Sequence, residues 1–283
     1  DILRAEEVQS LQTISEETLL NIYEDGTVVN NSNILGLAFY TMNGGKTYSK
    51  IKGICDDEKV SGDLDKITKI LDGTPNNADG TNVETEYDDL SRVTDGNSEV
   101  NTLDIDRLNT ALNEMSGDIK EALMNKSHID VKDIRAVNRM MNYVNRSAAR
   151  NSYYVPANIN GELSTVKITI ETGESEKGKV TIGMKDLDIK AEFTVNETNV
   201  KGLIMTGENA IDNGNYERFT EEFKTQIENL GLNLKNLSRS DTGYVGNDRT
   251  DNKSDNKVTT NTLFKVAKVY ISSIKKYAGQ TDK

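Results

Sequence analysis

The sequence predicts an α+β fold: a helical N-terminal region, then an antiparallel sheet packed by a helix, a polar tail and a C-terminal helix. Two kinds of periodicity lead to this fold class. Apolar and polar residues alternate over four short runs between residues 166 and 205, and a period of two is typical of half-buried strands. Elsewhere apolar residues recur every three or four positions, which is the period of an amphipathic helix.

Residues 1–150 are predicted to form a mainly helical domain with a long polar loop near residues 72–89. The spacing of apolar residues predicts helices over residues 3–11, 18–23, 30–42 and 64–71. Gly44 and Gly45 follow the third helix and are expected to end it. The loop is assigned because Gly, Asn and Asp are concentrated there, as is typical of turns.

Three segments of this region share a pattern that predicts a helix start: Val29–Ile34, Val100–Ile105 and Ile129–Ile134. Each has an aliphatic residue, then Asn or Asp, and three residues later a second Asn or Asp followed by Ile. The first polar side chain can accept hydrogen bonds from the unpaired amide groups at the beginning of a helix. The second and third segments continue to match at an offset of 29 residues, which favours a duplicated helical unit.

Residues 151–237 are predicted to form a sheet-plus-helix domain. Its four alternating runs, over 166–170, 180–184, 189–195 and 200–205, are separated by short polar breaks and indicate a meander. Pro156 favours an extended entry into this domain. Helical spacing then runs from Tyr216 to Leu230, and Gly231 follows where a helix often ends in a left-handed turn. We expect Phe223 of that helix to meet Phe193 of the third strand.

Two segments complete the chain. Residues 238–261 are almost wholly polar and are predicted to be a flexible linker, because they lack the apolar area that would offset the entropy of ordering. Residues 262–283 are predicted to contain an amphipathic helix. Its apolar stripe needs a partner, either the helical half of this chain or another protein.

Composition and charge exclude several classes of function. The chain has 283 residues with a net charge of −12 and no long basic stripe, so we expect no nucleic acid partner. The single cysteine, Cys55, excludes an internal disulfide framework and a cysteine-based zinc site. No apolar run approaches the roughly 18 residues of a membrane span. Because the sequence begins with Asp1 and not Met, we expect that upstream sequence has been removed.

The residue types that catalysis requires do not assemble into a motif. His128 is the only histidine, so neither a histidine metal pair nor a Ser-His-Asp triad can be built. The acids that follow Cys55 are expected to raise the pKa of its thiol and suppress the nucleophilic thiolate. The paired acids are expected to be solvated surface groups: Asp56–Asp57, Asp88–Asp89 and Glu221–Glu222. We therefore predict a non-enzymatic protein with no cofactor, metal or small-molecule substrate.

One alternative is a cell-surface interaction module. Val93–Asp104 is similar to the calcium loop of dockerin modules, which also occur as paired loop–helix repeats. Val93 stands where the first oxygen ligand belongs, however, and Ser98 stands where the turn requires Gly. A helix start is the preferred interpretation, and a degenerate dockerin-like module remains the alternative.

The sheet domain also resembles a known family. Leu187–Val195, a polar turn, Val200–Met205, a helix, and then Asn229–Leu232 resemble the C-terminal domain of flagellar hook-length control proteins, in an uncharacterised clostridial branch. The resemblance covers about residues 153–237. In the family, a Pro-x-x-Leu-Gly segment leads into two strands, a helix and a last strand. Here Met184 stands in place of the Pro and Asp188 in place of the Gly.

The resemblance implies a role in bacterial flagellum assembly, either in hook-length control or in switching export substrates. The implied partner is a protein of the flagellar export apparatus. The implied location is the cytoplasm, or outside the cell after export through that apparatus. Contact residues are expected in the turns on either side of the last strand of the meander: Asn196, Glu197, Asn199, Glu208 and Asn209.

Overall fold

The computed structural model describes residues 36, 40, 45–72, 103–126, 129–172, 177–207, 211–240 and 258–278. Its helices are α4 (Thr47–Cys55), α5 (Glu58–Asp72), α6 (Leu103–Asn125), α7 (Val131–Ala148), α8 (Asn213–Asn229) and α9 (Thr260–Ile274), with a short 3₁₀ turn, η2 (Lys185–Leu187). Its strands are β1 (Ser152–Ile159), β2 (Glu162–Thr172), β3 (Lys177–Met184), β4 (Ile189–Asn196), β5 (Asn199–Thr206) and β6 (Asn233–Ser240). The predicted α+β fold class is confirmed.

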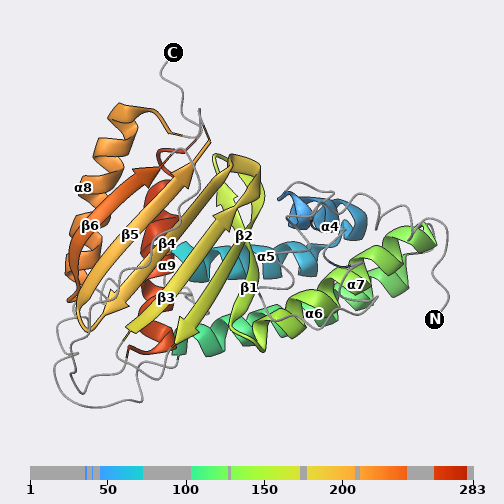
Figure 1. Ribbon diagram of the computed structural model, residues 1–283. Coiled ribbons are helices and arrows are strands. Elements are labelled where there is room, and N and C mark those ends of the chain that lie inside the picture. The colour runs from blue at the N-terminus through green and yellow to red at the C-terminus, as the bar shows by residue number, and fades with distance from the viewer. Residues whose placement is uncertain are drawn as a thin grey trace, which may run out of the picture.

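The strands form one six-stranded sheet in the order β1-β2-β3-β4-β5-β6 (Figure 1). The predicted meander is confirmed, because β2, β3, β4 and β5 pair with their neighbours in antiparallel fashion. β1 joins the same meander. β6 extends the sheet beyond the four strands of the predicted meander and pairs with β5 in parallel. A parallel neighbour requires a crossover, and α8 provides it between these two strands.

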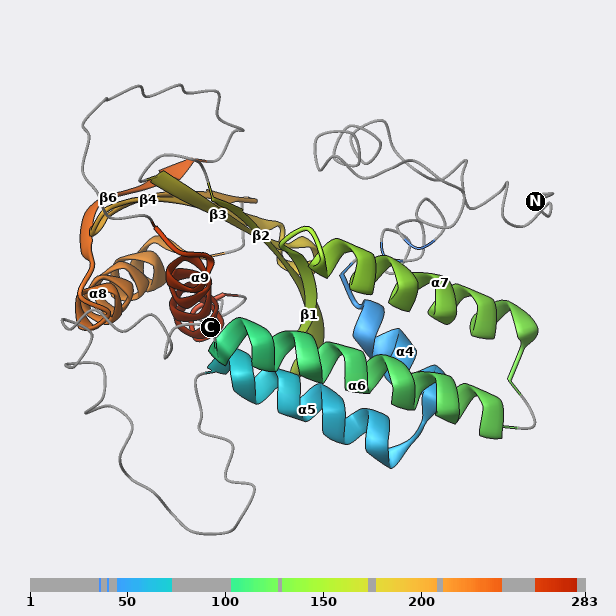
Figure 2. The ribbon, with the colours of Figure 1, turned by 90° about the horizontal axis from the view of Figure 1, so that it is seen from below.

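The inner face of the sheet packs on α8 and α9, which lie side by side beneath it (Figure 2). The Phe193 ring of β4 lies 5.1 Å from the Phe223 ring of α8 and 5.1 Å from the Tyr270 ring of α9. All three rings are fully buried. The predicted contact between Phe193 and Phe223 is therefore confirmed, and the predicted left-handed turn at Gly231 is confirmed by its φ of +72°.

The first strand is buried on both faces because helices approach it from two sides. Tyr153 points toward α9, where its ring lies 6.4 Å from Phe264. Tyr154 points to the opposite side, where its hydroxyl lies 2.9 Å from that of Tyr143 on α7 and its carbonyl accepts a 2.6 Å hydrogen bond from the Tyr48 hydroxyl of α4. β1 thus joins the helical half to the sheet.

The helix-start pattern is confirmed at its third occurrence. α7 begins at Val131, and the side chain of the capping residue Asp130 accepts a hydrogen bond from the Lys132 amide at 2.9 Å. α6 begins at Leu103, within the second segment, whereas Val29–Ile34 lies outside the described residues. Asn145 donates a 3.2 Å hydrogen bond to Ser116, 29 residues earlier, so equivalent positions of the two predicted repeats face each other.

Several predicted boundaries change. α4 was not predicted, and α5 begins earlier than the predicted helix over 64–71. The predicted linker over 238–261 overlaps regular structure at both ends, because β6 continues to Ser240 and α9 begins at Thr260. The predicted helices over 3–11 and 18–23 and the loop near 72–89 lie outside the described residues, apart from Asp72. Of 30–42, Gly36 and Tyr40 are described and helical.

The C-terminal helix finds its partners within this chain. α9 contacts β2 and β3 of the sheet together with α5, α6 and α8. Lys268 forms a 3.0 Å ion pair with Asp104 at the beginning of α6, and Lys275 pairs with Asp72 at the end of α5. One continuous hydrophobic core contains residues from both sides of the expected boundary at residue 150. The division into domains stays a prediction. Among the described helices, none has the length and apolar character to cross a membrane.

Candidate protein-contact surface

The β4–β5 turn carries three of the predicted contact residues. Asn196 and Asn199 are the last opposed pair of the hairpin, and Glu197 between them has a φ of +53°, in the left-handed region. The carbonyl of Thr198 accepts a 2.7 Å hydrogen bond from the Asn233 amide, which ties the turn to the start of β6. Backbone pairing therefore fixes the position of this turn.

The other predicted contact residues, Glu208 and Asn209, lie outside the described residues. Their neighbour Gly207 follows the end of β5, whereas Asn199 begins that strand. A strand rises about 3.3 Å per residue, so the two ends of β5 are about 23 Å apart. The structure thus places the Asn196–Asn199 turn and Gly207 at opposite ends of β5.

Arg239 of β6 links its strand to the C-terminal end of β5. Its guanidinium donates hydrogen bonds to the Thr206 hydroxyl at 3.2 Å and to the Ile211 carbonyl at 2.8 Å. It also lies 5.2 Å from the centre of the Tyr216 ring. Sequence reasoning missed this role because Arg239 lies in the predicted polar linker, where no local pattern indicates a strand.

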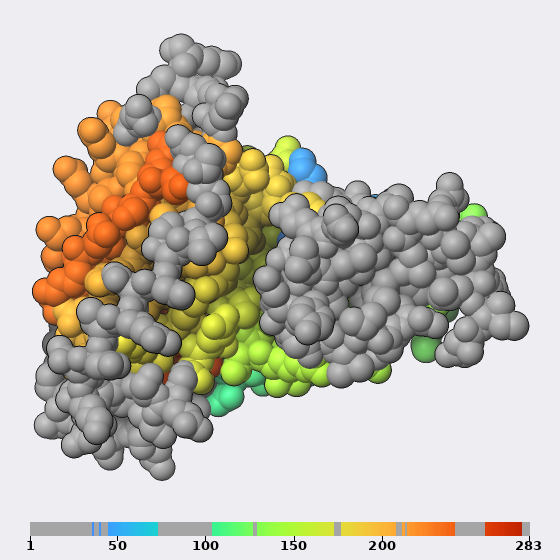
Figure 3. Space-filling model, in the orientation of Figure 1, coloured from blue at the N-terminus to red at the C-terminus, as the bar shows by residue number. Residues whose placement is uncertain are grey.

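The outer face of the sheet extends between the two ends of β5. In β3, β4 and β5 the buried residues alternate with more exposed ones, and directly opposed residues of neighbouring strands share a face. Seven charged residues of β2–β5 lie on this outer side and are called the lysine face here: Lys167, Glu171, Lys177, Lys179, Lys190, Glu192 and Lys201. Figure 3 views the molecule from this side, where strands β4, β5 and β6 form part of the visible surface.

Glu192 lies at the centre of the lysine face. Its carboxylate forms ion pairs of 3.2 Å with Lys179 on β3 and 3.2 Å with Lys190 on its own strand. Partial burial raises the pKa of this carboxyl, but Lys179 and Lys190 outweigh that effect and hold the pKa below its ordinary value. Glu192 is therefore a charged and internally paired group.

Cys55 lacks the solvent exposure and the lowered thiol pKa that are typical of a nucleophilic cysteine. It is buried at the end of α4, and burial is the main cause that raises the pKa of its thiol to about 11. Asp57 adds to the rise, whereas Lys126 opposes it. The predicted direction of the shift is confirmed, although desolvation contributes more than the neighbouring acids.

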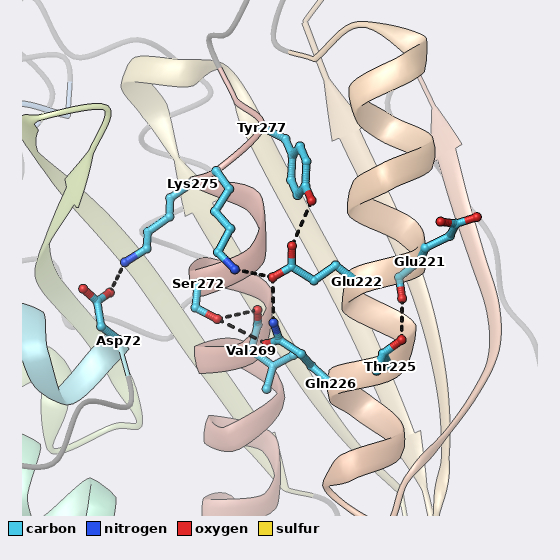
Figure 4. Close-up of polar contacts among 10 residues, drawn as sticks. Asp72, Glu221, Glu222, Thr225, Gln226, Val269, Ser272, Lys275 and Tyr277 are labelled. Carbon is cyan, nitrogen blue, oxygen red and sulfur yellow. Dashed lines mark hydrogen bonds and ion pairs between the residues drawn. The ribbon is translucent and has the colours of Figure 1, made fainter. Parts of the chain in front are cut away.

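The prediction that Glu221–Glu222 is a solvated pair is wrong for Glu222. Its carboxylate accepts hydrogen bonds from the Tyr277 hydroxyl at 2.9 Å and the Gln226 amide at 2.8 Å, and it pairs with Lys276 (Figure 4). Helix spacing directs Glu222 toward α9, which the sequence around Glu222 could not reveal. Glu221 is exposed as predicted, as is Asp56, whereas Asp57 is half-buried; Asp88–Asp89 and His128 lie outside the described residues.

No metal-binding cluster occurs within the part of the chain that the structure describes, where three or more His, Cys, Asp or Glu side chains nowhere converge suitably. Of the predicted dockerin-like loop Val93–Asp104, only its last two residues are described. Asp104 lies in the first turn of α6, and its carboxylate pairs with Lys268 at 3.0 Å. This ion pair accounts for Asp104 without a metal.

Known proteins offer no further guide to this surface. Comparison with protein-family models, with curated proteins and with solved structures gives no match.

Proposed function

We propose that this chain is a non-enzymatic protein-binding component of bacterial flagellum assembly, acting in hook-length control or in the switching of export substrates. Its partner is a protein of the flagellar export apparatus. The contact surface is the outer side of the sheet with the β4–β5 turn. The chain acts in the cytoplasm or after export through that apparatus.

The backbone at Asp188 is the observation that carries the resemblance furthest. The family has a Gly at this position, and here Asp188 adopts a φ of +52°, in the left-handed region that Gly occupies most readily. Its amide also closes the η2 turn by a hydrogen bond to the Lys185 carbonyl. The position therefore has the conformational requirement that a Gly would meet, although the residue type differs.

The order of elements gives further support. Two strands, a helix, a left-handed Gly and a last strand follow one another here as β4, β5, α8, Gly231 and β6. The family pattern has the same order. Such an order is shared by many α+β domains, so it supports the proposal without fixing the partner.

The test is deletion of the gene in its host, followed by electron microscopy of hooks and filaments. We expect hooks of altered length or a loss of filaments, and restoration by the wild-type gene. A copy with Phe223→Ala is the control for the fold, because removal of this buried ring should destabilise the protein by about 3–5 kcal/mol without touching the proposed contact surface. Normal hooks and filaments in the deletion strain would remove the flagellar assignment.

A further inference from the structure

Two ion pairs bridge α5 and α6, which lie side by side (Figure 2). Lys59 pairs with Glu121 at 3.3 Å, and Lys66 pairs with Glu114 at 2.5 Å. The residue number rises along α5 as it falls along α6, so the two helices are antiparallel. The ion pairs therefore fix which positions of the two helices face each other.

The positions between these ion pairs hold two acids. On α5, Asp63 comes four residues after Lys59 and three before Lys66. On α6, Asp118 is likewise three and four residues away from the two glutamates of the ion pairs. Residues three or four apart share one face of a helix, so Asp63 and Asp118 meet between the two ion pairs. On either side a lysine faces a glutamate, whereas here a carboxyl group faces a carboxyl group.

This acid pair is more enclosed than the ion pairs that flank it. Asp63 and Asp118 are half-buried, whereas the flanking side chains are between 44% and 64% exposed. The Oδ2 atom of Asp63 is buried and has no hydrogen-bond partner within the described part of the chain. Two ionised carboxylates at facing positions repel each other, and they can form a hydrogen bond only when one of them holds a proton.

We propose that Asp63 and Asp118 share one proton and thereby form a pH-sensitive clasp between α5 and α6. At mildly acidic pH the protonated carboxyl group donates a hydrogen bond to the other carboxylate and holds the helices together. At neutral pH both groups are ionised, and their repulsion loosens the contact. α5 also packs on β1 and α9, so the clasp acts where the helical half meets the sheet. The inference does not depend on the flagellar role.

The charges around Asp63 favour this assignment. Burial is the main cause that raises the pKa of Asp63 from 3.8 to about 6, and the charge of Asp118 and a hydrogen bond to it add to the rise. Lys66 lowers this pKa and Glu114 raises it, so the flanking ion pair contributes two opposing effects. A fully solvated aspartate would stay ionised down to about pH 4.

The other elements that pack on α5 do not supply a cation to the pair. β1 has no charged side chain, and the exposed lysines of α4, Lys50 and Lys52, have no share in the pKa shift of Asp63. Lys268 and Lys275 of α9 pair with other acids, at the beginning of α6 and the end of α5.

α7 approaches a different side of α6. It meets α6 at Ser116, which accepts a hydrogen bond from Asn145. Ser116 is two positions from Asp118, and residues two apart on a helix do not share a face. The charges that face Asp63 among the described residues therefore come from α5 and α6.

The first test follows the carboxyl carbon resonances of Asp63 and Asp118 by NMR, in the full chain with labelled aspartate, between pH 4 and pH 8. We expect both resonances to report a step near pH 6, because facing groups titrate as a pair. Asp118→Asn should lower the proton affinity of Asp63 at least about threefold, since it removes the facing charge but leaves the burial. The control Asp65→Asn removes a carboxylate from an exposed position of α5 and should leave the midpoint unchanged.

The second test measures amide hydrogen exchange in α5 and α6 at pH 5 and pH 7.5, corrected for the intrinsic effect of pH on exchange. Protection in the wild type should be about 3–10-fold lower at the higher pH, because the ionised pair favours opening. Asp118→Asn should reduce this ratio to below about twofold, since Asn can donate a hydrogen bond to Asp63 at both pH values. Asp65→Asn should behave as the wild type does.

Three results would overturn the inference: titration of Asp63 at the ordinary value of an aspartate, a midpoint that Asp118→Asn does not move, or equal protection at both pH values in the wild type. A response to Asp65→Asn as large as that to Asp118→Asn would overturn it as well. Circular dichroism must show that the variants fold. Asp63→Asn, which should remove the step near pH 6 altogether, is the second variant for the pair.

Discussion

The two faces of the sheet are built from the same strands but have opposite chemistry. On the inner face Phe193 meets Phe223 and Tyr270, and all three are fully buried. On the outer face of the same strand Glu192 is held between two lysines, whose side chains are 39% and 54% exposed. Alternation of side chains along a strand separates the two faces over a single residue. Along β4 the hydrophobic core therefore uses one face, and the side chains of the other face are half-buried or exposed.

The largest expected effect is on the inner face. Phe223→Ala should reduce the free energy of unfolding by about 3–5 kcal/mol, because it removes a ring that contacts Phe193, Phe219 and Tyr270. Thr194→Ala, at an exposed outer position of β4, should change it by less than about 0.5 kcal/mol. Urea unfolding measures both. A loss below about 1 kcal/mol for Phe223→Ala would show that the inner face is not the core.

Two glycines allow the same substitution to be made on each face. A Cβ at Gly202 would lie 2.6 Å from the Phe193 ring, which packs against Phe223 and Tyr270 and has no room to move. Gly202→Ala should therefore cost about 1–3 kcal/mol in the free energy of unfolding.

Gly183 lies on the outer face, where the atom nearest to an added Cβ is the Cβ of Lys167, at 4.0 Å. Gly183→Ala should leave the protein unchanged or stabilise it by up to about 1 kcal/mol, because Ala restricts the unfolded chain. Thermal unfolding of the two variants gives the answer. Equal destabilisation by both would contradict the assignment of the faces.

Asp63 on α5 is a half-buried carboxyl that can be compared with Glu192. Its pKa is raised from 3.8 to about 6, mainly by burial. The charge of Asp118 on α6 and a hydrogen bond to Asp118 add to the rise. The folded state therefore favours the protonated acid, and its stability should fall as pH rises from about 4 to 6. Asp63→Asn should abolish this fall and raise the free energy of unfolding at neutral pH by up to ~1 kcal/mol, a modest value because the site is partly solvated.

Chemical unfolding at several pH values measures the effect at Asp63. Asp65→Asn removes a carboxylate from an exposed position of the same helix and serves as the control. A pH profile that is identical in wild type and Asp63→Asn would show that Asp63 is not perturbed.

The smallest effect belongs to the outer face. The lysines lower the pKa of Glu192 below its ordinary value of 4.5, so its ionised form stabilises the folded state above that pH. Glu192→Gln should lower the free energy of unfolding at neutral pH by less than about 1 kcal/mol. The difference should shrink as pH falls through the lowered pKa, and added salt should reduce it as well. A larger loss that salt does not change would indicate a packing role for Glu192.

Local patterns in the sequence determined much of this fold. Alternation of apolar residues gave the strands β2 to β5, because each half-buried strand carries its own period of two. Asp130 and Gly231 marked a helix start and a helix end, since capping depends on residues within one turn. The burial of Phe193 and Phe223 followed from their positions in these periods.

The tertiary structure alone decided which elements meet. β6 is mostly polar, and its place beside β5 depends on backbone pairing and on Arg239, which reaches Thr206 on the neighbouring strand. Glu222 is paired because α9 lies beside α8, although the two segments are separated along the chain by β6 and the linker. The lysine face likewise exists only once four strands are in register, because neighbouring positions on a sheet are distant in sequence.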